Sequence, residues 1–402
     1  MNALTKFKPL VGREVISRIL EKTDTLKDKH IVHVNSSFIG GGVAELLNSL
    51  IPLMNQIGIK TGWRVLQGMP EFFGVTKQMH NALQSEPVTF TKEQKKVYYQ
   101  TNKNFSEFTH LDHDLVFVHD PQPAALVDFY TQRKKWLFRC HVDLSNPHPQ
   151  TWAYLRTFIN KYDHAIVSHS SYLRKDIIPP QSIIHPAIDP FTNKNKDMTE
   201  SESVHTLKKY GIENDKPIIS QISRFDKWKD PLGVINVFEH VREKTDCQLV
   251  LLGNPAMDDP QGVALFEDVQ EQVRRAKHAK DIHLIMLQDN LLVNALQRAS
   301  DVVLQKSKKE GFGLVVSEAL YKKTPVVASN VGGIPLQLIS GANGYLIEPS
   351  DDRSFAKHTI KLLKDEKLRA RMGEHGKDHV TKNFLITRLL LDWLDAFCTQ
   401  LN

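Results

Sequence analysis

The sequence predicts an α/β protein of two doubly wound, Rossmann-like domains, each built around a parallel sheet. Short apolar runs rich in β-formers alternate with longer segments of helical period along almost the whole chain, which is typical of repeated βαβ units. These runs fall into two series separated by a polar stretch. The length of 402 residues suffices for two or three domains that each bury a core.

Each series contains six predicted strands. The first comprises Ile31–Asn35, Gly62–Gln67, Leu115–His119, Trp136–Cys140, Ala165–Ser168 and Ser182–His185. The second comprises Pro217–Ile222, Gln248–Leu252, Ile282–Met286, Asp301–Leu304, Pro325–Ala328 and Gly344–Ile347. Helical patterns follow at Ser350–Asp365, Glu366–Lys377 and Ile386–Leu401. Ser350 is expected to cap the first of these helices, with Asp351 as its first-turn acid.

The domain boundaries follow from the polar stretch between the series. Residues 192–206 show neither helical nor strand period and are predicted to link the domains. The N-terminal domain is then 1–191 and the C-terminal domain 207–383. A terminal helix with no following strand must pack somewhere, and 384–402 is assigned to the N-terminal domain as a crossing helix.

The composition excludes several classes of protein. Hydrophobic residues make up 41% and charged residues 24%, values near the globular averages. No apolar run approaches the ~18–20 residues that a membrane-spanning helix needs, and the first twenty residues carry scattered charges and no apolar h-region, so no signal peptide is expected. A soluble, cytoplasmic protein is expected. The net charge of +6 forms no basic face with interleaved aromatics, which argues against nucleic acid but suits a small polyphosphate ligand.

Neither a disulfide framework nor a metal site is predicted. The three cysteines, Cys140, Cys247 and Cys398, show no CxxC or His/Cys ligand spacing, so reduced and mostly buried thiols are expected. His110, His113 and Asp114 resemble metal spacing. They lie in a polar approach to a strand, however, which argues against a bound metal.

A glycine-rich turn follows the first predicted strand. Gly40, Gly41 and Gly42 open a helix whose N-terminal N–H groups face an anion or a sugar hydroxyl. A plain tight turn is an equally open interpretation. The turn lacks the G-x-G-x-x-G spacing of a dinucleotide site, which argues against a dehydrogenase.

Two cations follow the first strand of the second series. Arg224 and Lys229 project from the carboxyl end of a parallel strand, where α/β sheets place their ligands. Asp230 is expected as an N-cap and Pro231 as the first helical residue after it. The cations would neutralise a diphosphate in place of a metal ion. Solvated surface charge is the alternative.

Two carboxylates flank a second glycine turn. Gly311 and Gly313 permit a tight turn, Glu310 stands at its mouth, and Glu318 lies two helical turns further on. Carboxylates can hold the vicinal hydroxyls of a ribose or a hexose. Alternatively, Glu310 belongs to a solvated charged run. A further glycine turn, SNVGGIP at 329–335, follows the next strand on the same sheet edge.

In combination these motifs resemble a known family. Arg224 with Lys229, then Glu310 and Glu318 around GFG, then PVVASNVGGIP, are similar to the donor half of the retaining family-4 glycosyltransferases. That family has the GT-B fold, with two domains facing across a cleft. The resemblance covers nearly the whole chain.

Further motifs resemble one subgroup of that family. The stretch 72–84, with SRFDKWKDP, HDPQP and RCHVDLSNP, is similar to trehalose glycosyltransferring synthases and trehalose phosphorylases. Most of the wider family has a glutamate directly after the GGxP turn. Here Leu336 and Gln337 follow, as in the trehalose subgroup.

The resemblance implies a retaining glucosyltransferase that moves glucose from a nucleotide diphosphate glucose to free glucose, forms trehalose by same-face attack and needs no metal or other cofactor. The implied catalytic residues are Arg224, Lys229, Glu310 and His141. The implied donor site contains Gly41, Gly42, Gly311, Phe312, Gly313, Leu314 and Glu318. The implied acceptor site contains Gly40, Lys77, His80, Asn81 and Asp143.

Other interpretations stay open. By itself, a histidine at a strand end such as His141 is more often structural than catalytic. A trehalose phosphorylase would use the same cations for inorganic phosphate, and a binding protein would hold nucleotide sugar or carbohydrate without turnover. The base of the nucleotide, the direction in the cell, the acceptor range and a homodimeric state are all left open by the sequence.

Overall fold

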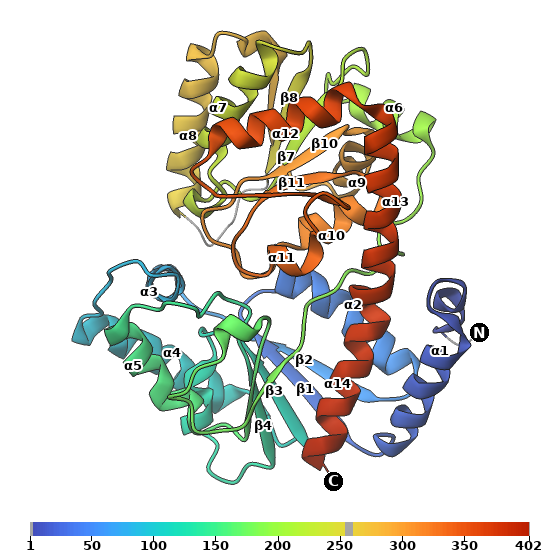
Figure 1. Ribbon diagram of the computed structural model, residues 1–402. Coiled ribbons are helices and arrows are strands. Elements are labelled where there is room, and N and C mark those ends of the chain that lie inside the picture. Colours follow the sequence, from blue (N-terminus) through green and yellow to red (C-terminus); the bar gives the residue numbers. More distant parts are fainter. Residues whose placement is uncertain (1–2, 254–259, 402) are drawn as a thin grey trace. The chain divides into compact units, whose positions relative to one another are not determined.

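The computed structural model describes residues 3–253 and 260–401, which form two compact α/β units, each with one six-stranded parallel sheet (Figure 1). Unit 1 comprises residues 1–187 and 386–402, and unit 2 comprises residues 188–385. Residues 1–2 and 402, at the ends of the predicted N-terminal domain, lie outside the described ranges. The predicted fold class is confirmed.

Unit 1 has the strand order β2-β1-β3-β4-β5-β6. Its strands are β1 (His30–Asn35), β2 (Lys60–Val65), β3 (Leu115–His119), β4 (Lys135–Arg139), β5 (His164–Val167) and β6 (Gln181–Ile183). Its helices are α1 (Lys8–Thr25), α2 (Gly42–Gln56), α3 (Pro70–Leu83), α4 (Lys92–Phe108), α5 (Pro149–Ile159) and α14 (Ile386–Leu401). All six predicted strands are present, and their ends differ from the prediction by at most two residues.

Unit 2 has the strand order β12-β11-β10-β7-β8-β9. Its strands are β7 (Ile218–Ile222), β8 (Gln248–Gly253), β9 (Ile282–Met286), β10 (Val302–Gln305), β11 (Val326–Ser329) and β12 (Gly344–Ile347). Its helices are α6 (Glu200–Lys208), α7 (Pro231–Arg242), α8 (Pro260–Arg275), α9 (Asn290–Ala299), α10 (Leu314–Tyr321), α11 (Ile334–Gln337), α12 (Asp352–Lys364) and α13 (Glu366–Asn383).

Each sheet has one point where the strand order reverses. In unit 1 the chain goes from β1 to β2 on one side and returns to β3 on the other; in unit 2 it makes the same reversal between β7 and β10. Open α/β sheets bind their ligands outside the carboxyl ends of the strands at such a switch point. The loops after β1, β3, β7 and β10 are therefore the places to look for a site.

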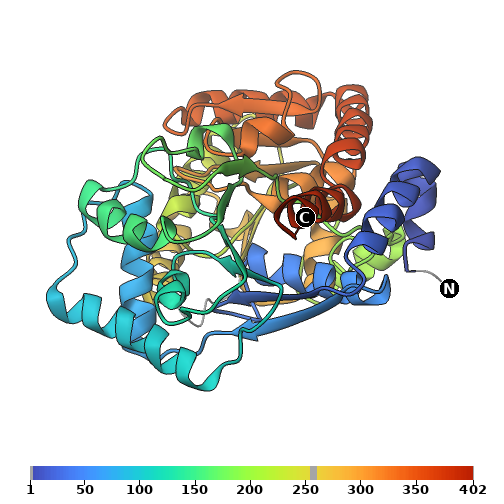
Figure 2. The ribbon, with the colours of Figure 1, turned by 90° about the horizontal axis from the view of Figure 1, so that it is seen from below.

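The terminal helix α14 belongs to unit 1, whose apolar core it completes. Leu390, Trp393 and Phe397 are at most 1% exposed and pack in one cluster with residues of β1 and β3. Helix α1 lies beside α14 (Figures 1 and 2), and Lys22 forms an ion pair with Asp395 between them. The burial of a continuous apolar face explains why a helix at the chain end returns to the first sheet.

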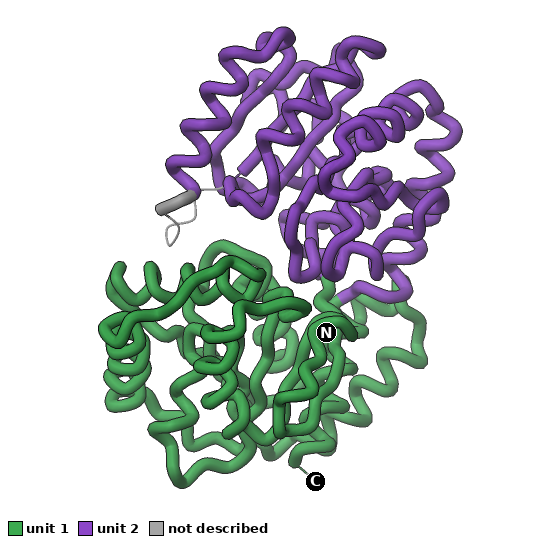
Figure 3. Tube along the Cα trace, turned by 60° about the vertical axis from the view of Figure 1, so that its left-hand side comes forward, with its two compact units in different colours: residues 1–187, 386–402 green, residues 188–385 purple. Residues whose placement is uncertain are grey.

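The predicted linker 192–206 is wrong, since most of this stretch is structured within unit 2 (Figure 3). Thr199 accepts a hydrogen bond from the N–H of Glu202, and the Glu202 carboxylate accepts one from the N–H of Thr199, which starts α6 with a capping box. The chain instead passes between the units at 187–188 and 385–386, where Ile188 and Leu385 form an isolated bridge.

The cap of α12 also differs from the prediction. Asp351, and not Ser350, occupies the N-cap, and its carboxylate accepts a hydrogen bond from the N–H of Ser354 at 2.9 Å. A carboxylate at the N-cap satisfies an orphan N–H and meets the positive end of the helix dipole.

The described residues can also be compared with the predictions about membrane helices and cysteines. Along them, no helix is both long enough and apolar enough to cross a membrane. Cys140 and Cys247 are buried free thiols, as predicted, and Cys398 is partly exposed. Burial raises the pKa of Cys247 to about 12, so this thiol stays protonated at neutral pH.

Candidate active site

Arg224 and Lys229 both lie on the loop that follows β7, as predicted. Asp226 fixes this loop, because its carboxylate accepts a hydrogen bond from the N–H of Trp228 at 2.9 Å and starts a short 3₁₀ turn at Lys227–Lys229. Its second oxygen lies 4.0 Å from the guanidinium of Arg224. One buried carboxylate thus caps the turn and lies close to the first cation.

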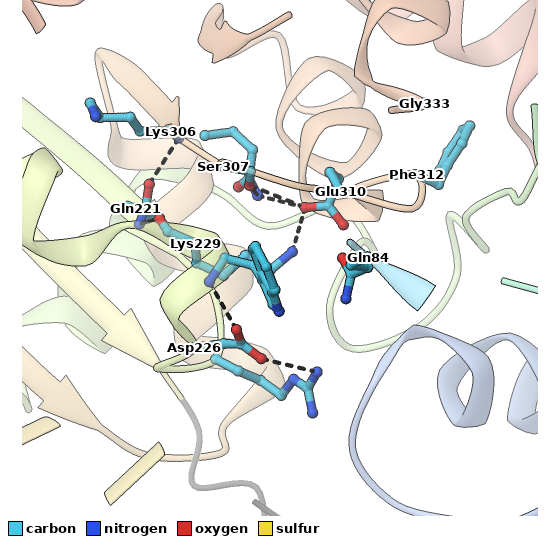
Figure 4. A network of polar contacts seen from close by, with 12 residues as sticks. Gln84, Gln221, Asp226, Lys229, Lys306, Ser307, Glu310, Phe312 and Gly333 are labelled. Carbon is cyan, nitrogen blue, oxygen red and sulfur yellow. Dashed lines mark hydrogen bonds and ion pairs between the residues drawn. The ribbon is translucent and has the colours of Figure 1, made fainter. Parts of the chain in front are cut away.

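Lys229 contacts Glu310, which lies on the loop after the neighbouring strand β10 (Figure 4). The Glu310 carboxylate also accepts hydrogen bonds from the Gln305 amide at 3.1 Å and the Ser307 hydroxyl at 3.3 Å. Two of the predicted catalytic residues therefore meet at the switch point of unit 2. Glu310 is 8% exposed, which rules out the solvated-run interpretation.

Contrary to the prediction, Asp230 does not cap α7 with its side chain. It occupies the N-cap position of α7 in a left-handed conformation (φ 47°), but its side chain forms no capping hydrogen bond. Its carboxylate instead pairs with Lys306, which is 3% exposed, and with Lys308 at 2.9 Å. The buried ammonium group attracts this carboxylate more strongly than a helix N–H group does. A Cβ at Gly233 would lie 2.2 Å from Asp230 Oδ2, so only glycine leaves room for the pair.

The second glycine turn, at 311–313, is held in place by close contacts with Gly333 and Gln337. Gly313 has φ 82° and precedes α10, and a Cβ at Gly333 would lie 2.9 Å from the Gly311 carbonyl oxygen. The buried Gln337 amide donates to the Phe312 carbonyl at 2.6 Å and accepts from the Ser317 N–H at 2.9 Å. A carboxylate could not make both contacts, because it cannot donate. This gives a physical reason for the glutamine that follows the GGxP turn.

Glu318 lies on α10 and is 1% exposed. Its carboxylate pairs with Lys194 at 3.0 Å and accepts from the Gln297 amide at 3.3 Å. Buried Lys322 donates to Asn195 at 2.7 Å and to Gln297 at 2.8 Å, and burial lowers the pKa of Lys322 to about 7. Lys194 and Asn195 belong to the stretch mistaken for a linker, so sequence reasoning missed both.

In unit 1, the first glycine turn lies after β1 as predicted. Gly40 and Gly41 have φ of 75° and 80°, and Gly42 is the first residue of α2. These left-handed conformations favour glycine. The turn thus brings a helix N-terminus to the carboxyl end of β1 at the switch point of this sheet.

His141, after β4, is held at two points by residues that end β3. Asp120 accepts a hydrogen bond from the backbone N–H of His141 at 2.7 Å, and the His141 ring lies 3.1 Å from His119, nitrogen to nitrogen. His119 in turn lies 3.0 Å from His33 of β1. We call His33, His119 and His141 the histidine chain. Burial raises the pKa of Asp120 to about 7, against the lowering effects of the His141 N–H and the Arg139 charge.

Four further residues of the predicted acceptor site belong to unit 1. Asp143 is 4% exposed and accepts a hydrogen bond from the N–H of Ser145 at 2.8 Å. Lys77, His80 and Asn81 lie on α3, as predicted. Asn81 is 1% exposed and contributes to the packing of that helix, whereas Lys77 and His80 are partly exposed.

The described residues contain no group of three or more His, Cys, Asp or Glu side chains that could hold a metal ion. Asp114, from the spacing considered above, accepts from the N–H of His30 at 2.9 Å and from the Lys134 ammonium at 3.1 Å. These contacts give Asp114 a structural role at the start of β1.

The comparisons with known proteins agree with this architecture. Residues 33–174 match the family model described as trehalose synthase, N-terminal domain, and residues 205–379 match glycosyl transferases group 1. The trehalose-phosphate synthase from Burkholderia xenovorans superposes with a TM-score of 0.75 at 13% identity, covering 92% of this chain and 99% of that chain. The fold is that of the GT-B glycosyltransferases, and the protein is a glycosyltransferase enzyme.

Relatives in sequence place the protein more closely among the glycosyltransferases. A trehalose synthase from Thermococcus litoralis is 42% identical over 98% of this chain and 96% of its own length. A trehalose phosphorylase from Pleurotus pulmonarius is 27% identical over 94% of this chain and 58% of its own length. The chain belongs to the trehalose synthase family, and it is a trehalose-related glycosyltransferase.

Proposed function

We propose that this enzyme transfers glucose from a nucleotide diphosphate glucose to free glucose, with retention at the anomeric carbon, and so forms trehalose. The observation that carries the proposal is the cationic loop after β7 at the switch point of unit 2, where Lys229 meets the Glu310 carboxylate. Cations at such a place suit the diphosphate of an activated sugar. Relatives named trehalose synthase support trehalose as the product.

Arg224 and Lys229 are proposed to stabilise the departing diphosphate. Asp226 caps the turn that carries Lys229 and lies 4.0 Å from the Arg224 guanidinium, so both cations belong to a loop that is ordered around this carboxylate. Preorganised groups that face developing charge commonly contribute about 3–4 kcal/mol each to catalysis. With two such cations, the reaction needs no metal ion, and we propose none.

The chemistry is proposed to occur on one face of the sugar. The bond from C1 to the diphosphate oxygen breaks and the bond from C1 to the acceptor oxygen forms. The acceptor proton passes to a donor phosphate oxygen, so the products are trehalose and a nucleoside diphosphate. Glu310 is a poor candidate for a covalent nucleophile, because Lys229, Gln305 and Ser307 already contact its carboxylate. Its proposed role is to position the glucosyl hydroxyls.

The remaining roles divide between the units. In unit 2, Glu318 is proposed to bind the ribose hydroxyls. The rest of the proposed donor site is Gly311, Phe312, Gly313 and Leu314 of unit 2, with Gly41 and Gly42 of unit 1. In unit 1, His141 is proposed to contact the reacting sugar. The proposed acceptor site contains Gly40, Lys77, His80, Asn81 and Asp143.

A substrate panel tests the proposal. UDP-, ADP- and GDP-glucose are each incubated with glucose, and a non-reducing disaccharide is expected from at least one of them. A parallel arm with trehalose and inorganic phosphate measures glucose 1-phosphate. Phosphorolysis without transfer from any nucleotide sugar would replace the proposal with a phosphorylase. Saturable binding of nucleotide sugar without turnover in either arm would replace it with a binding protein.

A further inference from the structure

The histidine chain crosses three adjacent strands of unit 1. Nδ1 of His33, inside β1, lies 3.0 Å from Nε2 of His119, and Nδ1 of His119, at the end of β3, lies 3.1 Å from Nε2 of His141. Because β1, β3 and β4 are neighbours, the three rings form one line from the core of the sheet to its carboxyl end. His33 and His119 are fully buried, and His141 is partly exposed.

All three rings are neutral near neutral pH. Burial lowers the pKa of His33 to about 3, and burial also lowers the pKa values of His119 and His141. The charge of buried Arg139 lowers the pKa values of His119 and His141 further, because it opposes a second positive charge nearby. A neutral imidazole carries one N–H donor and one lone pair.

Two hydrogen bonds between three neutral rings allow only two proton arrangements. In the first, His33 donates from Nδ1 to His119, and His119 donates from Nδ1 to Nε2 of His141. In the second, both bonds run the other way, from His141 towards His33. Any mixed arrangement makes two donors or two lone pairs face each other. The state of one ring therefore decides the state of all three.

The surroundings of His33, at the buried end of the histidine chain, decide between the two proton arrangements. Nε2 of His33 has no hydrogen-bond partner among the described residues, and the same holds for the indole N–H of Trp393. The Trp393 ring stacks on His33 with centroids 5.0 Å apart and planes 21° from parallel. A proton on Nε2 would add a second buried donor without a partner to this cluster, whereas an unprotonated Nε2 avoids that cost.

The geometry points to His33 and His119 as positioning residues that hold His141 in one tautomer, with its proton on Nδ1 and its Nε2 accepting from His119. His141 then presents an N–H donor at a defined nitrogen, while Asp120 fixes its backbone N–H at 2.7 Å. Under the proposed function, on which this last step rests, the Nδ1 donor meets a hydroxyl oxygen of the reacting sugar. A fixed tautomer spares the enzyme a proton rearrangement when substrate binds.

Nitrogen-15 NMR of protein labelled at histidine tests the tautomer without any substrate. Ring nitrogens with and without a proton resonate far apart, and the His141 signals are those absent from His141→Gln. We expect a protonated Nδ1 and a bare Nε2 on His141 at neutral pH. A protonated Nε2, or a doubly protonated ring, would overturn the proposal. Because this readout needs no turnover, it stays separate from any failure of the proposed function.

Two substitutions at His33 test the positioning role. His33→Phe keeps an aromatic ring against Trp393 but removes the donor to His119, so we expect only a small loss of thermal stability and a kcat lowered about tenfold. His33→Asn keeps a donor near the position of Nδ1 but loses the stacked ring, so we expect lower thermal stability and a kcat within about threefold of wild type. A purely structural residue would show the reverse ranking, and that result would overturn the proposal.

His164→Phe serves as the matched control. His164 lies at the start of β5 in the same sheet. Its ring contacts the Ser182 hydroxyl at 2.9 Å and, among the described residues, makes no hydrogen bond with the histidine chain. We expect an unchanged kcat. A loss equal to that of His33→Phe would show a general effect of removing a histidine from this sheet and would overturn the proposal.

Discussion

At the switch point of its sheet, unit 2 carries paired charges, whereas unit 1 carries neutral rings and backbone groups. Lys229 meets Glu310 and Lys194 meets Glu318 in unit 2. In unit 1 the corresponding edge holds the histidine chain and the glycine turn at 40–42. The two sheets have the same kind of strand order, so the fold does not decide this difference. This difference in side chains is why we propose that unit 2 supplies the charges that face the diphosphate and that unit 1 supplies the site of the uncharged acceptor.

Removing a cation from unit 2 should have the largest effect. Lys229→Ala is expected to lower kcat by ~10²–10³, because an ammonium that faces the leaving diphosphate is lost. Steady-state kinetics with a thermal melting curve measure this. The control is Lys227→Ala on the same 3₁₀ turn, since Lys227 is exposed and has no assigned role. Equal, small effects in both variants would return Lys229 to ordinary surface charge.

The neutral, buried state of His33 in unit 1 should affect how the free energy of unfolding depends on pH. The pKa of His33 is about 3 in the folded state and about 6.5 in the unfolded chain, so the unfolded state binds more protons between these values. The stability from neutral His33 is complete above pH 6.5 and is lost as the pH falls towards 3.

Comparison with His33→Phe isolates this contribution, because Asp120, His119 and His141 titrate in both proteins. Between pH 7 and pH 5, wild type should lose roughly 2 kcal/mol more unfolding free energy than His33→Phe. Urea unfolding at the two pH values measures the difference. Identical losses would contradict the neutral, buried state of His33.

Substitutions of the two carboxylates of unit 2, Glu318 and Glu310, should have different effects on KM and kcat. Glu318→Gln is expected to raise the KM for nucleotide sugar about tenfold with a small change in kcat, because a ribose contact is equally present in ground and transition states. Glu310→Gln is expected to lower kcat more than it changes KM, since the contact proposed for Glu310 is with the reacting sugar. The same defect in both variants would show that the roles are assigned wrongly.

The smallest expected effect is that of a chelator. EDTA should leave the rate of transfer unchanged in metal-free buffer, because Arg224 and Lys229 fill the role that a divalent cation would otherwise have. The assay is repeated after adding back Mg²⁺ or Mn²⁺. Loss of activity with EDTA and recovery with metal would contradict the role given to the cations.

The sequence predicted the twelve strands because parallel strands are buried on both faces and therefore appear as continuous apolar runs. It pointed to Arg224 and Lys229 because they lie on the loop after such a run, and to Glu310 because it precedes a glycine turn, and the structure brings Lys229 and Glu310 into contact. The start of α6 was missed although Thr199 and Glu202 carry the spacing of a capping box. The polar composition of this segment hid that signal.

The histidine chain could not be predicted from spacing. His33 and His119 are single histidines within apolar strands, and they become neighbours of His141 only through the order β1-β3-β4. Lys194 was missed for a similar reason, since its contact with Glu318 joins residues more than a hundred positions apart. Long-range polar contacts of this kind leave no local pattern in a sequence.

The most direct test of the account follows the glucosyl group itself. Nucleotide diphosphate glucose labelled with carbon-13 at C1 of its glucosyl group is mixed with unlabelled glucose, and the products are read by NMR. We predict trehalose with the label in one of its two rings, in the α configuration of the donor, together with the released nucleoside diphosphate. Label in free glucose, in glucose 1-phosphate or in a β-linked disaccharide would contradict the account.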